Sequence, residues 1–469
     1  MNSAPFDLLH VPFLGNILRS RWGRLIFQIP LFILLALIVY DGFTGPQFAP
    51  ENTATVLAWV HYRGLVILVI LIGGNFFCMG CPFTIPRTIA RKLSLRGSRW
   101  PARLRNKWVS IFSLFGIFWL YEWLDLWASP LLTAWVAIAY FVIAFGLEAW
   151  FSESAFCKYV CPLGAFNFTF SMVSPLQITE RNRQVCRECE GKECVNGSEQ
   201  VPGCGTELFV PTIESNMDCV FCLDCVRACP YDNVALQARN PLKEARHSLT
   251  VPSFSLAFMI MSLLFTGLMN AFGMVPPVYE LQAWLADTLG LRSDALRLML
   301  VFGTGNLLLP AVILFVLTLI SRRPGGSFIK SMRAEAVRYV PVLIPLGAGI
   351  WLAHYGFHLA IGGLAIVPVL QSFLLDHGIS LLGSAPRWDL SMLLPQSWIF
   401  PLQVAAIFLG LFTSLTALAL PALESDQPPL DSLRQILPWA VLLVLLTIAA
   451  LSVFNLPMEM RGTLQLGNP

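Results

Sequence analysis

Four cysteines near the middle of the chain have a spacing that suits an iron–sulfur cluster. Cys219, Cys222, Cys225 and Cys229 follow one another as C-x2-C-x2-C-x3-C, and Pro230 comes directly after the last. In a run of this spacing, three thiolates ligate one [4Fe–4S] cluster and the fourth reaches a neighbouring cluster. The spacing therefore predicts one-electron chemistry at thiolate-held iron.

Four more cysteines precede this run, with less regular spacing. Cys186, Cys189, Cys194 and Cys204 are arranged as C-x2-C-x4-C-x9-C, with Gly205 after the last. Eight thiolates suffice for two [4Fe–4S] clusters. The cross-over rule assigns Cys186, Cys189, Cys194 and Cys229 to one cluster, and Cys204, Cys219, Cys222 and Cys225 to the other. Two alternatives stay open: a pair of zinc sites, because C-x2-C pairs also bind zinc, and a single cluster beside a degenerate site.

Two further cysteine pairs lie at the ends of apolar segments. Cys78 and Cys81 are followed by Pro82, and Cys157 and Cys161 are followed by Pro162. A proline stops a regular helix and turns the chain. Because both apolar segments run in the same direction across the membrane, the four thiols are expected at one face, where they predict a third iron–sulfur cluster. The alternative is a set of buried, reduced thiols at helix ends.

The composition indicates that lipid surrounds most of the chain. Of its 469 residues, 56% are hydrophobic and only 13% are charged, whereas a soluble domain carries about 25% charged residues. A helix needs about 20 apolar residues to span a bilayer. By this rule about nine spans are expected, near 24–41, 56–76, 108–127, 131–151, 250–272, 298–320, 338–361, 397–420 and 436–455. The apolar segments 280–290 and 366–395 contain Asp and Pro, and we expect interfacial helices or loops there.

The distribution of Lys and Arg predicts the orientation of these spans. Residues 87–107 are rich in Lys and Arg, whereas residues 41–55 contain neither. Basic loops stay on the cytoplasmic side, so the N-terminus is expected inside and, with nine spans, the C-terminus outside. All twelve cysteines then lie at the cytoplasmic side of a bacterial inner membrane. That compartment is reducing, which favours metal ligation over disulfides.

These observations predict a mainly α fold, a polytopic membrane helix bundle with a small α+β ferredoxin-like insert. We expect a four-span membrane region over residues 1–174, a cytoplasmic two-cluster domain over 175–248 and a C-terminal membrane region of about five spans over 249–469. The basic run 87–107 is expected to contact lipid headgroups.

Ionisable residues inside apolar segments are candidates for a second kind of site. His61 and Arg63 lie near the start of the second expected span, and His354 and His358 are spaced i, i+4 in the seventh. Intramembrane ionisable residues are functional candidates by default. They suit a quinone site or axial ligation of a haem b, and the alternative is a structural role at the membrane interface. His61 and Cys78 are 17 residues apart, about 26 Å along a helix, so direct electron transfer between these two positions would be slow.

Taken together, the motifs resemble those of the membrane polyferredoxin family. Its members include the quinol-linked subunits of periplasmic nitrate reductase systems and the regulator-like proteins of nitrous oxide reductase systems, and cytochrome oxidase assembly ferredoxins are relatives. The resemblance covers about residues 60–240 and rests on Cys78, Cys81, Cys157, Cys161 and the run from Cys219 to Cys229. It implies electron transfer between the quinone pool and a redox partner. We expect two departures: the extra-cytoplasmic flavin-binding domain of the nitrous oxide relatives is lacking, and about four spans that the short family members do not have follow residue 249.

The sequence thus favours a redox protein that exchanges electrons between membrane quinone and a cytoplasmic ferredoxin, a flavodoxin or a redox enzyme complex. The alternative from another class is an assembly or regulatory factor that uses its clusters for cofactor maturation. A transporter would need related halves with broken helices, and no internal repeat is visible. No nucleotide-binding loop is present, and a net charge of +3 does not suggest a nucleic-acid partner.

Overall fold

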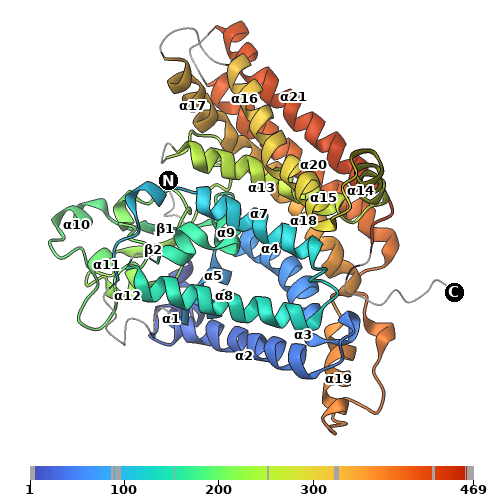
Figure 1. Ribbon diagram of the computed structural model, residues 1–469. Helices are drawn as coiled ribbons and strands as arrows, with labels where there is room; N and C mark the ends of the chain where they lie inside the picture. Colours follow the sequence, from blue (N-terminus) through green and yellow to red (C-terminus); the bar gives the residue numbers. More distant parts are fainter. Residues whose placement is uncertain are drawn as a thin grey trace. The chain divides into compact units, whose positions relative to one another are not determined.

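The computed structural model describes residues 6–85, 89, 97–152, 154–250, 253–321, 327–424, 428–459 and 461. Helices dominate this described part of the chain (Figure 1). Part of the basic run used to predict the orientation falls outside the described residues, namely Arg87, Arg91, Lys92 and Arg96, together with Arg322 and Arg323 after the sixth expected span.

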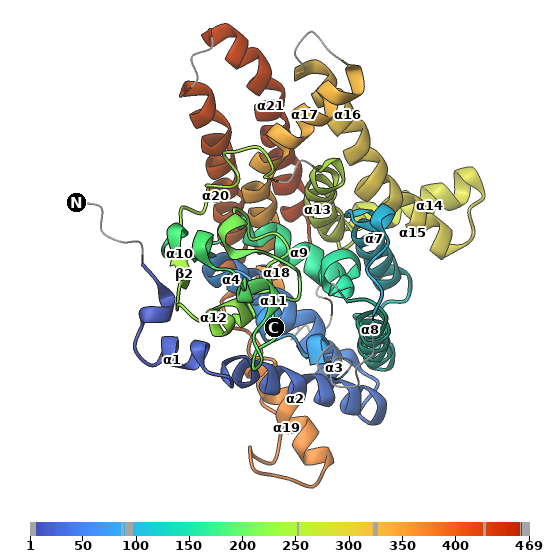
Figure 2. The same ribbon diagram turned by 90° about the vertical axis from the view of Figure 1, so that its left-hand side faces the viewer.

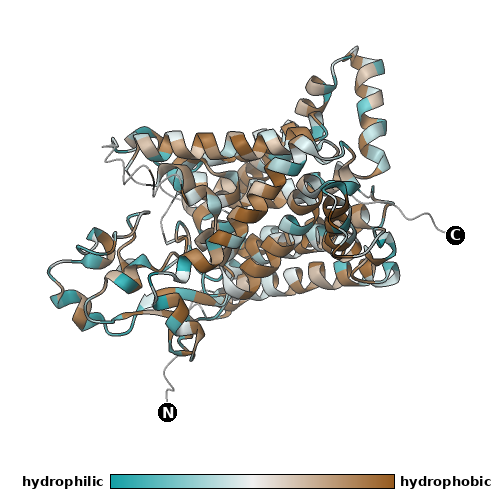
Figure 3. Cartoon of the chain, turned by 90° about the horizontal axis from the view of Figure 1, so that it is seen from below, coloured by the Kyte–Doolittle hydropathy of each residue, from teal (hydrophilic) through white to brown (hydrophobic). Residues whose placement is uncertain are grey.

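Eight helical segments of the described chain are long and apolar enough to cross a membrane. Their hydrophobic character is visible in Figure 3, and it makes the chain a multi-pass membrane protein. The segments are Gly23–Thr44, Thr53–Gly73, Pro130–Trp150, Phe254–Phe272, Asp294–Ser321, Phe328–Gly362, Gln396–Leu423 and Leu430–Phe454.

The count differs from the expected nine at 108–127, where the structure forms the shorter helix α7, Trp108–Trp123. Its 16 residues rise about 24 Å, less than the roughly 30 Å of a hydrocarbon core. The start of α7 nevertheless lies close to the segment that follows the next helix, α8 (Pro130–Trp150). The Ser110 hydroxyl, near the start of α7, donates to the carbonyl of Tyr159, which follows α8, at 2.8 Å. The pair α7–α8 therefore acts as one antiparallel hairpin.

Backbone contacts divide the chain into two compact units. The first contains Met1–Leu35, Leu68–Ser110 and Ala139–Glu244, and the second contains Ala36–Ile67, Ile111–Ile138 and Ala245–Pro469. This division differs from the three segments expected along the sequence, because the cysteine-rich insert groups with the chain around Cys78 and Cys161 in one unit.

The first unit is built around a two-stranded antiparallel sheet. Strand β1, Leu176–Glu180, pairs with β2, Val234–Ala238, in a register that sets Ile178 opposite Leu236. Figure 1 shows short helices beside this pair. The core of this unit includes Ile178, Val210, Phe221 and Leu236. The helices of this unit are α1 (Leu14–Arg19), the first half of α2 (Gly23–Thr44), α5 (Phe76–Met79), the second half of α8, α9 (Pro162–Ser171), α10 (Arg183–Glu188), α11 (Glu193–Asn196) and α12 (Asp224–Ala228).

The second unit is a bundle of long helices. Close packing of α18 (Ile344–Gly362) and α20 (Gln396–Leu423) organises it. Gly349 and Gly410 let the two backbones approach, because a Cβ on Gly349 would lie 2.5 Å from the carbonyl oxygen of Ala406. Small residues serve this purpose in membrane bundles. Helix α21 (Pro429–Phe454) lies beside α20 in Figures 1 and 2.

The other helices of the second unit surround this pair or connect to it. They are α3 (Thr53–Thr55), α4 (Tyr62–Gly73, shared with the first unit), α13 (Phe254–Phe272), α14 (Pro276–Leu289), α15 (Asp294–Gly303), α16 (Leu309–Ser321), α17 (Phe328–Tyr339) and α19 (Ile366–Asp376).

The two segments expected to be interfacial are helical in part. Residues 280–290 fall within α14 except for the last, and α19 occupies the start of 366–395. Both helices are too short to qualify as spans among the described residues.

Candidate metal centres and a buried histidine site

A first cavity of the cysteine-rich insert is lined by four cysteines from two parts of the sequence. Cys204 comes from the irregular group, and Cys219, Cys222 and Cys225 come from the regular run. The loop around them adopts left-handed backbone conformations at Asp218, Phe221 and Leu223, which are uncommon for residues other than glycine and concentrate at functional sites.

This backbone directs N–H groups at the sulfur atoms of the first cavity. The Phe221 N–H donates to Cys219, and the Asp224 N–H donates to Cys222. The Leu208 N–H also donates to Cys204 Sγ, at 3.4 Å. Hydrogen bonds to cysteine sulfur are one of the means by which proteins set the potential of iron–sulfur clusters, so the donor set fits such a group.

A second cavity is lined by Cys186, Cys189, Cys194 and Cys229. Asn233 binds two of these sulfur atoms: its side-chain amide donates to Cys186 Sγ at 3.2 Å, and its backbone N–H donates to Cys229 Sγ at 3.4 Å. The fold therefore gathers the same two groups of four cysteines that the cross-over rule pairs. Their role as ligands stays a prediction.

The two cavities are close neighbours. Val210 lines both of them, and its backbone N–H donates to Cys194. Val210 is 1% exposed, so a buried apolar side chain lies between the two groups of cysteines.

The membrane-edge cysteines form a third group in the same unit. Cys78, Cys81, Cys157 and Cys161 interact with one another electrostatically. Cys161 is the residue before α9, and its sulfur accepts the Gly164 N–H at 3.1 Å. The N-terminus of a helix favours negative charge, and this contact is suited to a thiolate.

Two side chains from other helices support this third group. The Asn167 amide donates to Cys78 Sγ at 3.1 Å, and the Tyr140 hydroxyl lies within hydrogen-bond distance of Cys161 Sγ, at 2.9 Å. Cys157 belongs to a single turn of π-helix, Phe156–Val160. Such turns occur frequently at functional sites.

Burial changes the chemistry of the thiols when no metal is bound. It raises the pKa of Cys78 to about 12 and that of Cys222 to about 12. The pKa values of Cys81, Cys157 and Cys225 are raised for the same reason. A thiolate at these positions at neutral pH therefore needs a positive charge beside it, which a bound metal supplies.

Asn75 and Gly74 join the end of the second span to the first cavity. The Asn75 amide donates to the carbonyl of Cys219 at 2.7 Å and to the Ser171 hydroxyl at 2.9 Å. Gly74 has a φ of +77°, and a Cβ there would lie 2.8 Å from the Phe221 ring. Cys78 packs in one cluster with Cys222 and Phe168, so the membrane-edge group directly adjoins the first cavity.

Among the described residues, no three His, Cys, Asp or Glu side chains gather closely enough around one point to hold a single metal ion.

His61 has both ring nitrogens in contact with backbone oxygens. Nδ1 lies 3.0 Å from the Val56 carbonyl, and Nε2 lies 3.0 Å from the Gly363 carbonyl. The residue ends a π-helical turn, Val56–His61. Its ring ties the start of the second span to the end of α18.

His354 and His358 are buried side by side on α18 in the second unit. Their ring centroids are 5.3 Å apart, and the two residues are 0% and 3% exposed. Neither ring nitrogen of His354, nor Nε2 of His358, has a hydrogen-bond partner within the described part of the chain. Unpaired buried polar atoms are costly, so these nitrogens are available to bind a polar ligand.

Arg63 is held by aromatic rings instead of a carboxylate. Its guanidinium lies 4.2 Å from the centroid of the Tyr121 ring, 4.8 Å from that of Trp59 and 5.4 Å from that of Tyr355. One of its nitrogens donates to the Tyr121 hydroxyl at 3.1 Å. Arg63 also acts electrostatically on His354 and His358, and the three residues therefore form one buried polar group.

A buried ion pair lies close to this group, and sequence reasoning missed it. Arg461 donates to both carboxylate oxygens of Glu122 at 2.8 Å and to the Gly273 carbonyl at 2.6 Å. Glu122 lies in the last turn of α7 and is 8% exposed. A carboxylate within an apolar helix indicates a buried polar contact. The residues near Glu122 in the sequence, however, do not identify a partner 339 positions away.

Comparison with known proteins gives two partial similarities. Over 122 residues, 26% of this chain, it is 31% identical to the putative electron transport protein YccM of Escherichia coli (strain K12). Over 97 residues, 20% of this chain, it is 30% identical to the uncharacterized protein MJ0750 of Methanocaldococcus jannaschii. The matches span only 30% and 36% of these relatives. No family model matches the chain, and no solved structure matches it significantly.

Proposed function

We propose that this chain is a membrane-bound electron-transfer protein that relays electrons between membrane quinone and a cytoplasmic carrier, either ferredoxin or flavodoxin. The observation that carries the proposal is that all twelve cysteines are free and fall into three groups of four in one compact unit. Four thiolates are what a [4Fe–4S] cluster requires. The similarity to a protein named as a putative electron transport protein supports the same class of function.

The residues around the thiols suit clusters better than zinc. Bound clusters would supply one-electron oxidation and reduction. The N–H donors from Phe221, Asp224 and Asn233 stabilise negative charge on sulfur. Backbone and side-chain amides in this arrangement favour the more negative, reduced state of a cluster.

Buried residues of this chain would keep the three groups of cysteines close to one another. Val210 separates the two cavities of the insert, and Phe221 and Asn75 connect the first cavity to Cys78. These side chains are buried and exclude water from the intervening space. Because water is excluded and the side chains are tightly packed, the polar groups along this path reorganise little when an electron is transferred.

For the quinone end, we propose the group of Arg63, His354 and His358. The unpaired nitrogens of the two His side chains would bind the quinone oxygens and exchange the protons that accompany quinol oxidation. Arg63 would stabilise negative charge on the same oxygens. Both nitrogens of His61 face carbonyl oxygens, so His61 is not positioned to ligate a haem b, which needs an imidazole nitrogen facing the iron.

The test is turnover. The anaerobically purified chain, reconstituted in vesicles, should reduce added ubiquinone or menaquinone when dithionite-reduced ferredoxin or flavodoxin is supplied, or run in reverse with quinol. Loss of this exchange in His354→Leu, with unchanged iron content, is the expected companion result. Normal iron content without exchange between any of these carriers and quinone would instead favour the assembly or regulatory factor.

A further inference from the structure

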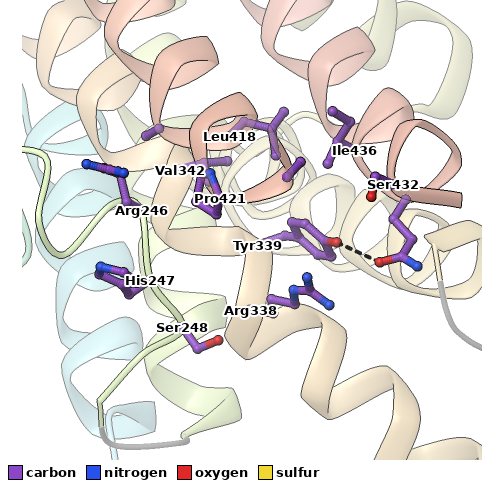
Figure 4. A pocket seen from close by; sticks show the side chains of 13 residues that line it. Arg246, His247, Ser248, Arg338, Tyr339, Val342, Leu418, Pro421, Ser432 and Ile436 are labelled. Atoms are coloured by element: carbon purple, nitrogen blue, oxygen red, sulfur yellow. Dashed lines mark hydrogen bonds between the residues drawn. The ribbon is translucent and has the colours of Figure 1, made fainter. Parts of the chain in front are cut away.

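A cavity of about 220 Å³ lies in the second unit, away from the histidine group (Figure 4). Its walls come from the segment before α13, the end of α17, the end of α20 and the start of α21. The lining combines polar or charged residues with apolar ones, and in Figure 4 Leu418 and Ile436 lie at the top of the view and Arg338 at the bottom. The polar or charged residues are Arg246, His247, Ser248, Arg338, Tyr339, Ser432 and Gln435, and the apolar ones are Val342, Ala417, Leu418, Pro421, Ala422 and Ile436.

The cavity is at the boundary between polar and apolar parts of these helices. Pro421 is two residues from the end of α20, and Ser432 is three residues from the start of α21. Arg338 and Tyr339 end the polar helix α17, and the apolar part of the segment begins after them. Helix ends of this kind lie at the level of lipid headgroups.

Within the described part of the chain, the charged residues that line the cavity are arginines. Arg246 donates to Glu424 at 2.9 Å, but the Glu424 side chain is 64% exposed and therefore largely screened by water. The Nε of Arg246 is buried and has no partner among the described residues. No carboxylate of the described chain pairs with Arg338, whose guanidinium lies 5.1 Å from the centroid of the Tyr339 ring.

Backbone contacts hold these groups in place. The Leu249 N–H donates to the Val337 carbonyl at 3.0 Å, which fixes the segment carrying Arg246 beside the one carrying Arg338. The Tyr339 hydroxyl donates to Gln435 at 3.2 Å, joining α17 to α21. Val342 and Leu418, two of the apolar lining residues, are buried.

We propose that this cavity binds an anionic phospholipid, with the phosphate at Arg246 and Arg338 and the start of an acyl chain against Leu418 and Ile436. Guanidinium groups pair with phosphate through two parallel hydrogen bonds. Basic pockets between membrane helices bind the headgroups of anionic lipids. The combination of cationic rim and apolar wall matches a lipid better than free phosphate, which would leave the wall without a partner. This site is independent of the proposed electron transfer.

The experiment is native mass spectrometry of the full-length protein in neutral detergent with phosphatidylglycerol, cardiolipin or phosphatidylcholine added. We expect the wild type to retain the two anionic lipids and not phosphatidylcholine. Arg246→Gln and Arg338→Gln should each weaken the binding about tenfold or more, the size expected for a lost charged hydrogen bond.

Arg434→Gln is the matched control, because Arg434 is an exposed arginine on the same end of α21 that does not line the cavity. Equal losses in all three variants would mean general surface attraction and would overturn the proposal. Equal retention of phosphatidylcholine, or displacement of the lipid by millimolar inorganic phosphate alone, would overturn it as well. The comparison of anionic lipids with phosphatidylcholine is made on the wild-type protein. It therefore tests the proposal even if one of the variants misfolds.

Discussion

The side-chain amide of Asn75 donates a hydrogen bond of 2.7 Å to the backbone carbonyl of Cys219. Asn75 follows the second membrane span, and Cys219 opens the regular cysteine run 144 residues later. This contact fixes the distance between the membrane-edge thiols and the first cavity of the insert. It is the physical link on which electron transfer between the two groups would depend.

Replacing Asn75 by Ala should loosen that link. The buried hydrogen bonds to Cys219 and Ser171 would be lost, at a cost of about 1–3 kcal/mol in the free energy of unfolding. We expect a lower midpoint of thermal unfolding and faster loss of iron during anaerobic gel filtration. Asn240→Ala, at an exposed position, is the control. Equal behaviour of the two variants would show that Asn75 does not hold the groups together.

Gly74→Ala probes the close approach of the same region to Phe221. A Cβ would lie 2.8 Å from the Phe221 ring and 2.9 Å from the Ser174 hydroxyl, at a backbone φ of +77°. We expect Phe221 to move and the iron content to fall. Gly146→Ala is the matched control because no atom lies within 4 Å of its added Cβ. Iron analysis of both variants checks this expectation, and full iron content in Gly74→Ala would refute it.

Tyr140→Phe should lower the reduction potential at the membrane-edge group. The hydroxyl lies 2.9 Å from Cys161 Sγ, and a donor to sulfur favours the reduced state. If the bond is worth about 1.4 kcal/mol more in the reduced state, the shift is about 60 mV downward. Potentiometric EPR measures it, with Tyr40→Phe, in the second unit, as the control. An unchanged or higher potential would count against a cluster beside Tyr140.

Arg63→Gln and His354→Leu should slow quinone reduction without affecting metal content. Both residues lie in the second unit, whereas all the cysteines belong to the first. We expect quinone reduction to fall at least about tenfold, the effect of losing a general acid–base or charged group. His377→Asn, at an exposed His, serves as control. Unimpaired turnover in both variants would place the quinone elsewhere.

Much of the fold follows from the sequence because apolar length and cysteine spacing are local properties. Eight of the nine expected spans are present as long apolar helices, and the remaining one is the shorter α7. The cross-over rule groups the same cysteines that line each of the two cavities of the insert. The contacts of Asn75, Asn167 and Arg461 do not follow from the sequence, because each joins residues at least 89 positions apart. Long-range pairing of single polar side chains leaves no periodic pattern in a sequence.

The most direct test of the central claim is the iron and acid-labile sulfide content of the chain purified without oxygen, with EPR spectra recorded during stepwise reduction. We expect about twelve irons and about twelve sulfides per chain, because three cubanes with four thiolate ligands each require them. We also expect EPR signals that appear as electrons are added and that show magnetic coupling between reduced clusters. About eight irons would leave the membrane-edge thiols without a cluster. A folded, colourless protein that contains no iron would contradict the account altogether.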